Sequence, residues 1–186
     1  MKRYTRSFLF LALVIALASL AAGCGKQTEQ ANQLVDDVNN IAAQVQPKLD
    51  QADKLLVQAT DQLSQGKTEE EKSSLSQAQA LIDEIIAQID TAKSKTDEAA
   101  VLDISDTYRQ YLQAKGRALE QALGLTQTTR EITVVLLADP TVEKPDTLSK
   151  VTELETKAAG QAAQRNVAED EANGIAQQNS DEWPNS

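Results

Sequence analysis

Residues 34–63 have the sequence LVDDVNNIAAQVQPKLDQADKLLVQATDQL, in which apolar residues recur at alternating steps of three and four. Residues three and four apart share one face of an α-helix, so this spacing predicts an amphipathic helix, which we expect over residues 29–65. Its apolar stripe consists of Val35, Val38, Ala42, Val45, Leu49, Ala52, Leu56, Ala59 and Leu63.

Pro47 lies inside this predicted helix, and a proline has no N–H to donate to the preceding turn. It occupies the face opposite the apolar stripe, where water can bond the carbonyl that loses its partner. Because the stripe keeps its phase on both sides of Pro47, we expect one bent helix rather than two helices that meet at Gln46.

Three further segments have the same helical pattern. Residues 69–95 follow Gly66, which suits a helix C-terminus, residues 97–138 come next, and residues 146–178 follow Pro145. The apolar stripe of the second predicted helix, residues 69–95, is Leu75, Ala78, Ile82, Ile85, Ile89 and Ala92. The stripe of the third predicted helix, residues 97–138, is Val101, Ile104, Tyr108, Tyr111, Lys115, Ala118, Ala122, Leu125, Thr129, Ile132 and Leu136.

Two points about these segments stay open. Gly124 and the polar run that ends at Thr129 weaken the third helix, which either continues through them or breaks near Gly124. The stripe of the fourth predicted helix begins with Leu148, Val151 and Leu154 and then thins to alanine, so we expect the far end of this helix to pack loosely.

Four amphipathic segments with short connections predict an all-α fold, an elongated antiparallel bundle of about four helices.

Composition excludes several kinds of chemistry. The chain has no histidine and one cysteine, Cys24, so catalytic histidines, a structural zinc site and an intrachain disulfide are excluded. We expect no enzyme activity, no metal and no cofactor. Residues 1–23 hold three of the 18 basic residues and none of the 28 acidic ones, which leaves 15 basic and 28 acidic residues and a formal charge of −13. Nucleic-acid binding requires a cationic surface and is not expected.

The first 23 residues have the layout of a secretory signal peptide. Lys2, Arg3 and Arg6 form a cationic head, and the apolar run from Phe8 to Leu20 has only 13 residues. A run of that length is shorter than the roughly 18 residues that span a bilayer.

The sequence Leu20-Ala-Ala-Gly-Cys24 resembles the lipobox of bacterial lipoproteins, although Ala21 stands where leucine is commoner. The resemblance implies that the Cys24 thiol receives a diacylglyceryl group, that the signal is cut before Cys24, and that fatty acyl chains such as palmitate hold the protein on a membrane. Two or more chains anchor a protein stably, whereas one chain does not.

The expected organisation is therefore a signal peptide at 1–23, the acylated cysteine and a tether at 24–30, a helical bundle domain at 31–178, and a disordered tail at 179–186. The expected location is the extracytoplasmic side of the bacterial cell envelope. The membrane is the cell membrane, or the outer membrane if the host is Gram-negative.

Tyr108, Tyr111 and Lys115 lie one turn apart on one face of the third helix, and they permit two interpretations. They could form a small polar pocket inside the bundle. The interpretation that we favour is that both tyrosines fill the core, with their hydroxyls at its rim, while Lys115 extends to water.

For the whole protein, we expect a scaffold, spacer or interaction module that contacts an envelope protein. The alternative is a carrier of a small apolar or lipid ligand within the bundle.

Overall fold

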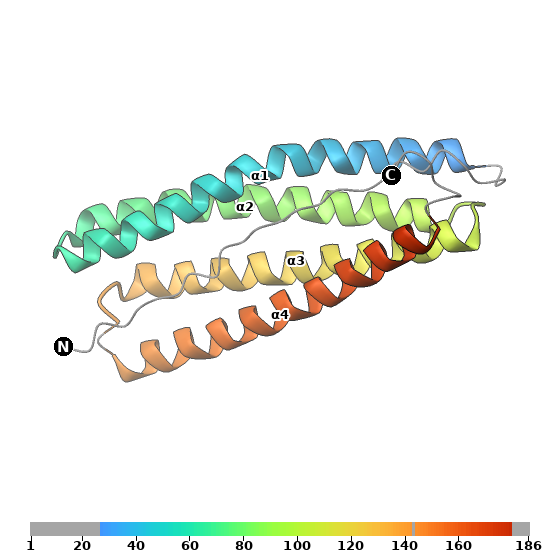
Figure 1. Ribbon diagram of the computed structural model, residues 1–186. Helices are drawn as coiled ribbons and strands as arrows, with labels where there is room; N and C mark the ends of the chain where they lie inside the picture. The colour runs from blue at the N-terminus through green and yellow to red at the C-terminus, as the bar shows by residue number, and fades with distance from the viewer. Residues whose placement is uncertain (1–26, 143, 180–186) are drawn as a thin grey trace.

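The computed structural model describes residues 27–142 and 144–179, and this part of the chain forms four long α-helices without a strand (Figure 1). Each helix runs antiparallel to the one before it. The all-α bundle predicted from the sequence is confirmed. The helices are α1 (Thr28–Ser64), α2 (Thr68–Ala100), α3 (Asp106–Ala138) and α4 (Pro145–Gln178).

Helix α1 is continuous through Pro47, which is exposed, and it bends along its length (Figure 1). The prediction of one bent helix is therefore confirmed. The helix begins at Thr28, so residues 28–30 belong to α1 rather than to the predicted tether, and Ala31 is already fully buried. The cysteine and the signal peptide before it lie outside the described residues, as do residues 180–186 of the predicted tail.

The predicted turn between the second and third helices was wrong. The sequence placed it near residues 95–97, but α2 continues to Ala100. Thr96 is buried in α2 and donates its hydroxyl to the Ala92 carbonyl at 2.9 Å, and Lys93 pairs with Asp97 one turn on at 2.7 Å. Thr96 and Asp97, either of which could cap the next helix by residue type, thus stabilise the interior of α2 instead.

The true boundary lies at residues 101–105. The Ser105 hydroxyl accepts a hydrogen bond from the Tyr108 N–H at 3.2 Å, as expected of a helix N-cap. Val101 and Ile104, which the sequence assigned to the stripe of the third helix, therefore lie in the turn. Ile104 is buried there, whereas Val101 is 82% exposed.

Helix α3 is continuous through Gly124, which resolves the point that the sequence left open. The hydroxyls of Thr126, Thr129 and Thr133 each donate to the carbonyl four residues earlier, at 2.8 to 3.0 Å. These threonines therefore satisfy their own polar groups within the helix and do not require a turn.

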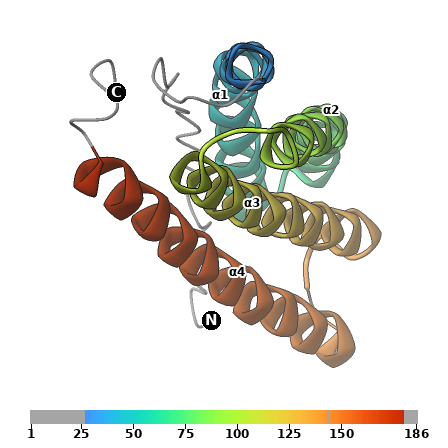
Figure 2. The ribbon, with the colours of Figure 1, turned by 90° about the vertical axis from the view of Figure 1, so that its right-hand side faces the viewer.

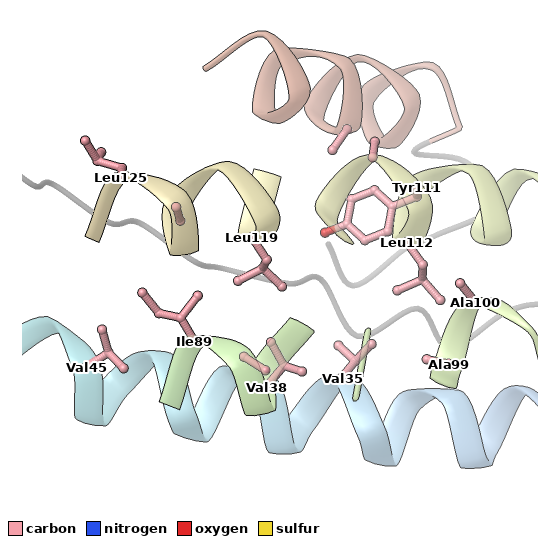
Figure 3. Close-up of a cluster of buried hydrophobic side chains, with 14 of the residues drawn as sticks. Val35, Val38, Val45, Ile89, Ala99, Ala100, Tyr111, Leu112, Leu119 and Leu125 are labelled. Carbon is pink, nitrogen blue, oxygen red and sulfur yellow. The ribbon is translucent and has the colours of Figure 1, made fainter. Parts of the chain in front are cut away.

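The predicted stripes of α1 and α2 form the core together with α3. In Figure 3, apolar side chains of α3 such as Leu112 and Leu119 face those of α1 and α2, among them Val38 and Ile89. The α2 stripe is entirely buried, and so is the α1 stripe apart from Ala42 and Leu63. Large aliphatic residues on these three helices supply most of the buried apolar surface that stabilises the fold.

Helix α4 packs chiefly on α3. Among the described residues, no Cα atom of α4 comes within 8 Å of α1 or α2, and Figure 2 shows α4 crossing α3 on the side away from α2. The helices thus pack in chain order, α1 on α2, α2 on α3 and α3 on α4, and buried residues of all four helices contribute to the core clusters. The buried residues of α4 are Val151, Leu154, Ala158, Ala168 and Ala172.

Candidate functional site

Tyr108, Tyr111 and Lys115 lie along one face of the first half of α3, as their spacing predicts. Their side chains are at most 5% exposed. The two tyrosine ring centroids are 6.4 Å apart with an interplanar angle of 33°. The Lys115 Nζ lies 5.8 Å from the centre of the Tyr111 ring, within the range of a cation–π contact.

Lys115 does not reach water, so the interpretation that it extends to solvent was wrong. Its Nζ lies 2.5 Å from Glu169 Oε2 of α4, and the two side chains are 5% and 22% exposed. Helix α4 covers this part of α3 and supplies the carboxylate that a buried ammonium requires. Glu169 could not be predicted as its partner, because nothing in the sequence fixes the position of α4 along α3.

Tyr108 connects α3 with α1. Its hydroxyl donates a hydrogen bond to Asn32 Oδ1 at 2.8 Å, and burial raises the pKa of its phenol well above the ordinary value. The neighbouring Tyr111 and Asp36 raise this pKa further. Asn32 is a second residue that could not be predicted from the sequence, because its contact joins positions 76 residues apart.

Together these residues form a buried polar group that joins three helices. Asn32 belongs to α1, the two tyrosines and Lys115 to α3, and Glu169 to α4. The hydroxyl of Tyr108 and the ammonium of Lys115 each already have a protein partner. This arrangement positions the three helices against one another.

The segment from Gly124 to Thr129 is a second point of contact with α4. A Cβ added at Gly124 would lie 2.6 Å from Nε2 of Gln161, whose Oε1 accepts a hydrogen bond from the Thr128 hydroxyl at 2.9 Å. The absence of a side chain at Gly124 therefore makes room for Gln161. Gly124, which weakens the helix in isolation, thus lies directly against Gln161 of α4.

Exposed ion pairs connect neighbouring helices on the outside of the bundle. Lys48 of α1 pairs with Glu84 of α2 at 2.7 Å, and Arg117 of α3 pairs with Glu171 of α4 at 2.7 Å. Such pairs contribute little stability each, about 0 to 1 kcal/mol. These ion pairs help to determine which faces of neighbouring helices pack together.

A shallow hollow lies on the surface of α1, and side chains of this single helix line it. Its residues are Asp50, Asp53, Lys54, Val57, Gln58 and Asp61. Within residues 27–142 and 144–179, no three acidic, cysteine or histidine side chains group in a way that could hold a metal ion. Among the helices of that part, none combines the length and apolar character that crossing a bilayer requires.

Comparison with protein-family models, with curated proteins and with solved structures finds no match for this chain. Its function is therefore inferred from its own residues.

Proposed function

We propose that the protein is a lipid-anchored, extracytoplasmic component of the bacterial cell envelope, and that it acts as a non-enzymatic scaffold, spacer or interaction module. The observation that carries this proposal is the position of Cys24. It is the only cysteine of the chain, and it directly follows a cationic head, a 13-residue apolar run and a segment of small residues.

The dimensions of the helices suit a spacer. Helix α1 has 37 residues and is about 55 Å long at 1.5 Å per residue. It begins four residues after Cys24, so an anchor at that cysteine would hold one end of a long, narrow body. The strongly acidic character of the chain favours a body that is repelled by an anionic lipid surface rather than spread over it.

The packing of the helices supports a scaffold rather than a carrier. A carrier needs space between its helices for an apolar ligand, whereas Ala78, Ala92, Ala114 and Ala118 let the helix backbones approach closely. The polar group around Lys115 is likewise filled by protein contacts.

The proposal is tested by site-specific photo-crosslinking in the native host. A photoreactive residue is placed at one exposed position per helix, at Gln51 of α1, Gln77 of α2, Gln113 of α3 and Gln164 of α4. A scaffold gives a discrete adduct with another envelope protein from some of these faces and not from others. Native mass spectrometry of the same purified protein reports any bound small molecule.

Two results would contradict the scaffold. One is the absence of a protein adduct from all four faces, and the other is a stoichiometric small molecule that remains bound through purification. The second result would favour the carrier, which also predicts a melting temperature that rises with added ligand.

A further inference from the structure

The chain just after Cys24 is fastened to the turn between α2 and α3. The Gln27 N–H donates to the Asp103 carbonyl at 3.2 Å, and the Asp103 N–H donates to Gln27 Oε1 at 2.9 Å. These two hydrogen bonds join positions 76 residues apart. The start of the described chain and this turn therefore occupy the same end of the bundle, as Figure 1 also shows.

Arg109 and Ile104 hold the turn itself in place. Arg109 of α3 donates to the carbonyls of Leu102 and Ile104, at 3.3 Å each, and pairs with Asp106 at 2.6 Å. The side chain of Ile104 is buried at 5% exposure. With these residues fixed, the 82% exposure of Val101 is a stable feature of this end of the molecule.

Chain length limits how far this turn can lie from the lipid anchor. Gln27 is three residues after Cys24, and three residues span at most about 11 Å when fully extended. An acyl chain on Cys24 enters the bilayer directly at that residue. Gln27, to which the turn is hydrogen-bonded, is thus held within about 11 Å of an anchor at Cys24.

We propose that the turn at residues 101–105 is the surface that contacts the membrane, with Val101 among the lipid headgroups and the bundle standing upright. The inference rests on the proposed anchoring through Cys24. The occupant of this surface is the same lipid layer that holds the acyl chains. The turn between α1 and α2, near Gln65, then lies about 55 Å away at the opposite end of α1.

The charges on this end limit how deeply it sits. Asp103 and Asp106 are exposed beside Val101, and carboxylates are excluded from the hydrocarbon core. The contact is therefore with headgroups, and it adds to an attachment that the acyl chains provide. An exposed valine elsewhere on the surface would carry no such meaning, because single exposed apolar residues are common.

The experiment places a fluorescent label at single introduced cysteines of the full chain, which is produced in its own host and reconstituted in phosphatidylcholine vesicles with a headgroup-linked quencher. Acylation of Cys24 blocks its thiol, so each introduced cysteine is the only reactive one. The variants are Val101→Cys and Glu98→Cys at the anchored end, and Gln65→Cys at the far end as the matched control. All three positions are exposed.

We expect the labels at 101 and 98 to lose most of their emission to the quencher, and the label at 65 to keep its emission. Equal quenching at all three positions means that the bundle lies flat, and it would overturn the inference. Quenching at 65 alone, or at none of the positions in a vesicle-bound protein, would also overturn it.

The outcomes that would refute the proposed anchoring differ from those that would refute the proposed orientation. A protein whose mass shows an unacylated Cys24 and which does not bind vesicles would refute the anchoring and the orientation together. An acylated, vesicle-bound protein without quenching at 101 and 98 would refute the orientation alone.

Discussion

Lys115 of α3 and Glu169 of α4 form an ion pair with a Nζ–Oε2 distance of 2.5 Å, in which the lysine side chain is only 5% exposed. The two partners differ in their access to water, because 22% of the Glu169 side chain is exposed. Removing one partner from a buried pair leaves an uncompensated charge, and the cost depends on how well water reaches that charge.

The two single substitutions of this pair should therefore differ. Glu169→Gln leaves a buried ammonium without a counter-ion and should lower the free energy of unfolding by about 3 kcal/mol. Lys115→Met leaves a carboxylate that water can reach and should cost about 1 kcal/mol. Urea unfolding followed by circular dichroism measures both values. A Lys115→Met cost equal to or above that of Glu169→Gln would contradict this account.

Stability should fall in alkaline solution because of Tyr108. The buried phenol has a raised pKa in the folded protein, so its contribution is complete below the unfolded pKa of about 10 and is lost as the pH rises further. Tyr108→Phe removes this ionisation and also the bond to Asn32, at a cost of about 1 kcal/mol near pH 7. The wild type should thus lose its advantage over Tyr108→Phe between pH 9 and 11. If the stabilities of the wild type and Tyr108→Phe changed in parallel over that pH range, the pKa of Tyr108 would not be raised by folding.

Substitution of alanine at two glycines should change the stability of the protein in opposite directions. Gly66 ends α1 with a φ of 74°, a conformation that side chains disfavour, so Gly66→Ala should destabilise the protein by about 1 kcal/mol. Gly174 lies inside α4 with no heavy atom within 4 Å of an added Cβ, so Gly174→Ala should stabilise it by up to about 1 kcal/mol. Thermal unfolding of the two variants checks the pair, and a shift of the same sign in both would count against the geometry.

Helix α4 should open before the rest of the bundle. It buries two large aliphatic residues, Val151 and Leu154, whereas α1, of similar length, buries five. Native-state hydrogen exchange should therefore give the α4 amides a lower opening free energy than the most protected amides of α1, α2 and α3.

Two substitutions of glutamate by glutamine, one at the α3–α4 contact and one at the α1–α2 contact, provide the control for this experiment. Glu169→Gln should reduce the protection of α4 further, whereas Glu84→Gln breaks an exposed pair between α1 and α2 and should leave α4 unchanged. If the most protected amides of all four helices shared one opening free energy in the wild type, α4 would not be a separate unit.

Much of the fold could be predicted because it depends on local spacing. The stripes of α1 and α2 mark the buried faces, and their unbroken phase across Pro47 identifies one helix. The boundary between α2 and α3 could not be predicted, because Thr96 and Asp97 suit a helix cap as well as a helix interior. Only the burial of Thr96 and the pairing of Asp97 with Lys93 distinguish the two.

The candidate site was only partly accessible from the sequence, for a physical reason. Helical spacing places Tyr108, Tyr111 and Lys115 on one face of α3. It carries no information about which residues of α1 and α4 lie opposite, so Asn32 and Glu169 were missed. The alanine-rich stripe of α4 gives little information about its position along α3, where Gln161 lies against Gly124 and Glu169 pairs with Lys115.

The most direct test of the central claim is the intact mass of the protein after gentle detergent extraction from the membranes of its host. The account predicts a chain that begins at Cys24 and carries the added mass of two or three acyl chains, and a Cys24→Ser variant that lacks this mass and is released from the membrane or left uncleaved. A chain that retains residues 1–23, or one that begins at an unmodified Cys24 while still bound to the membrane, would contradict the account.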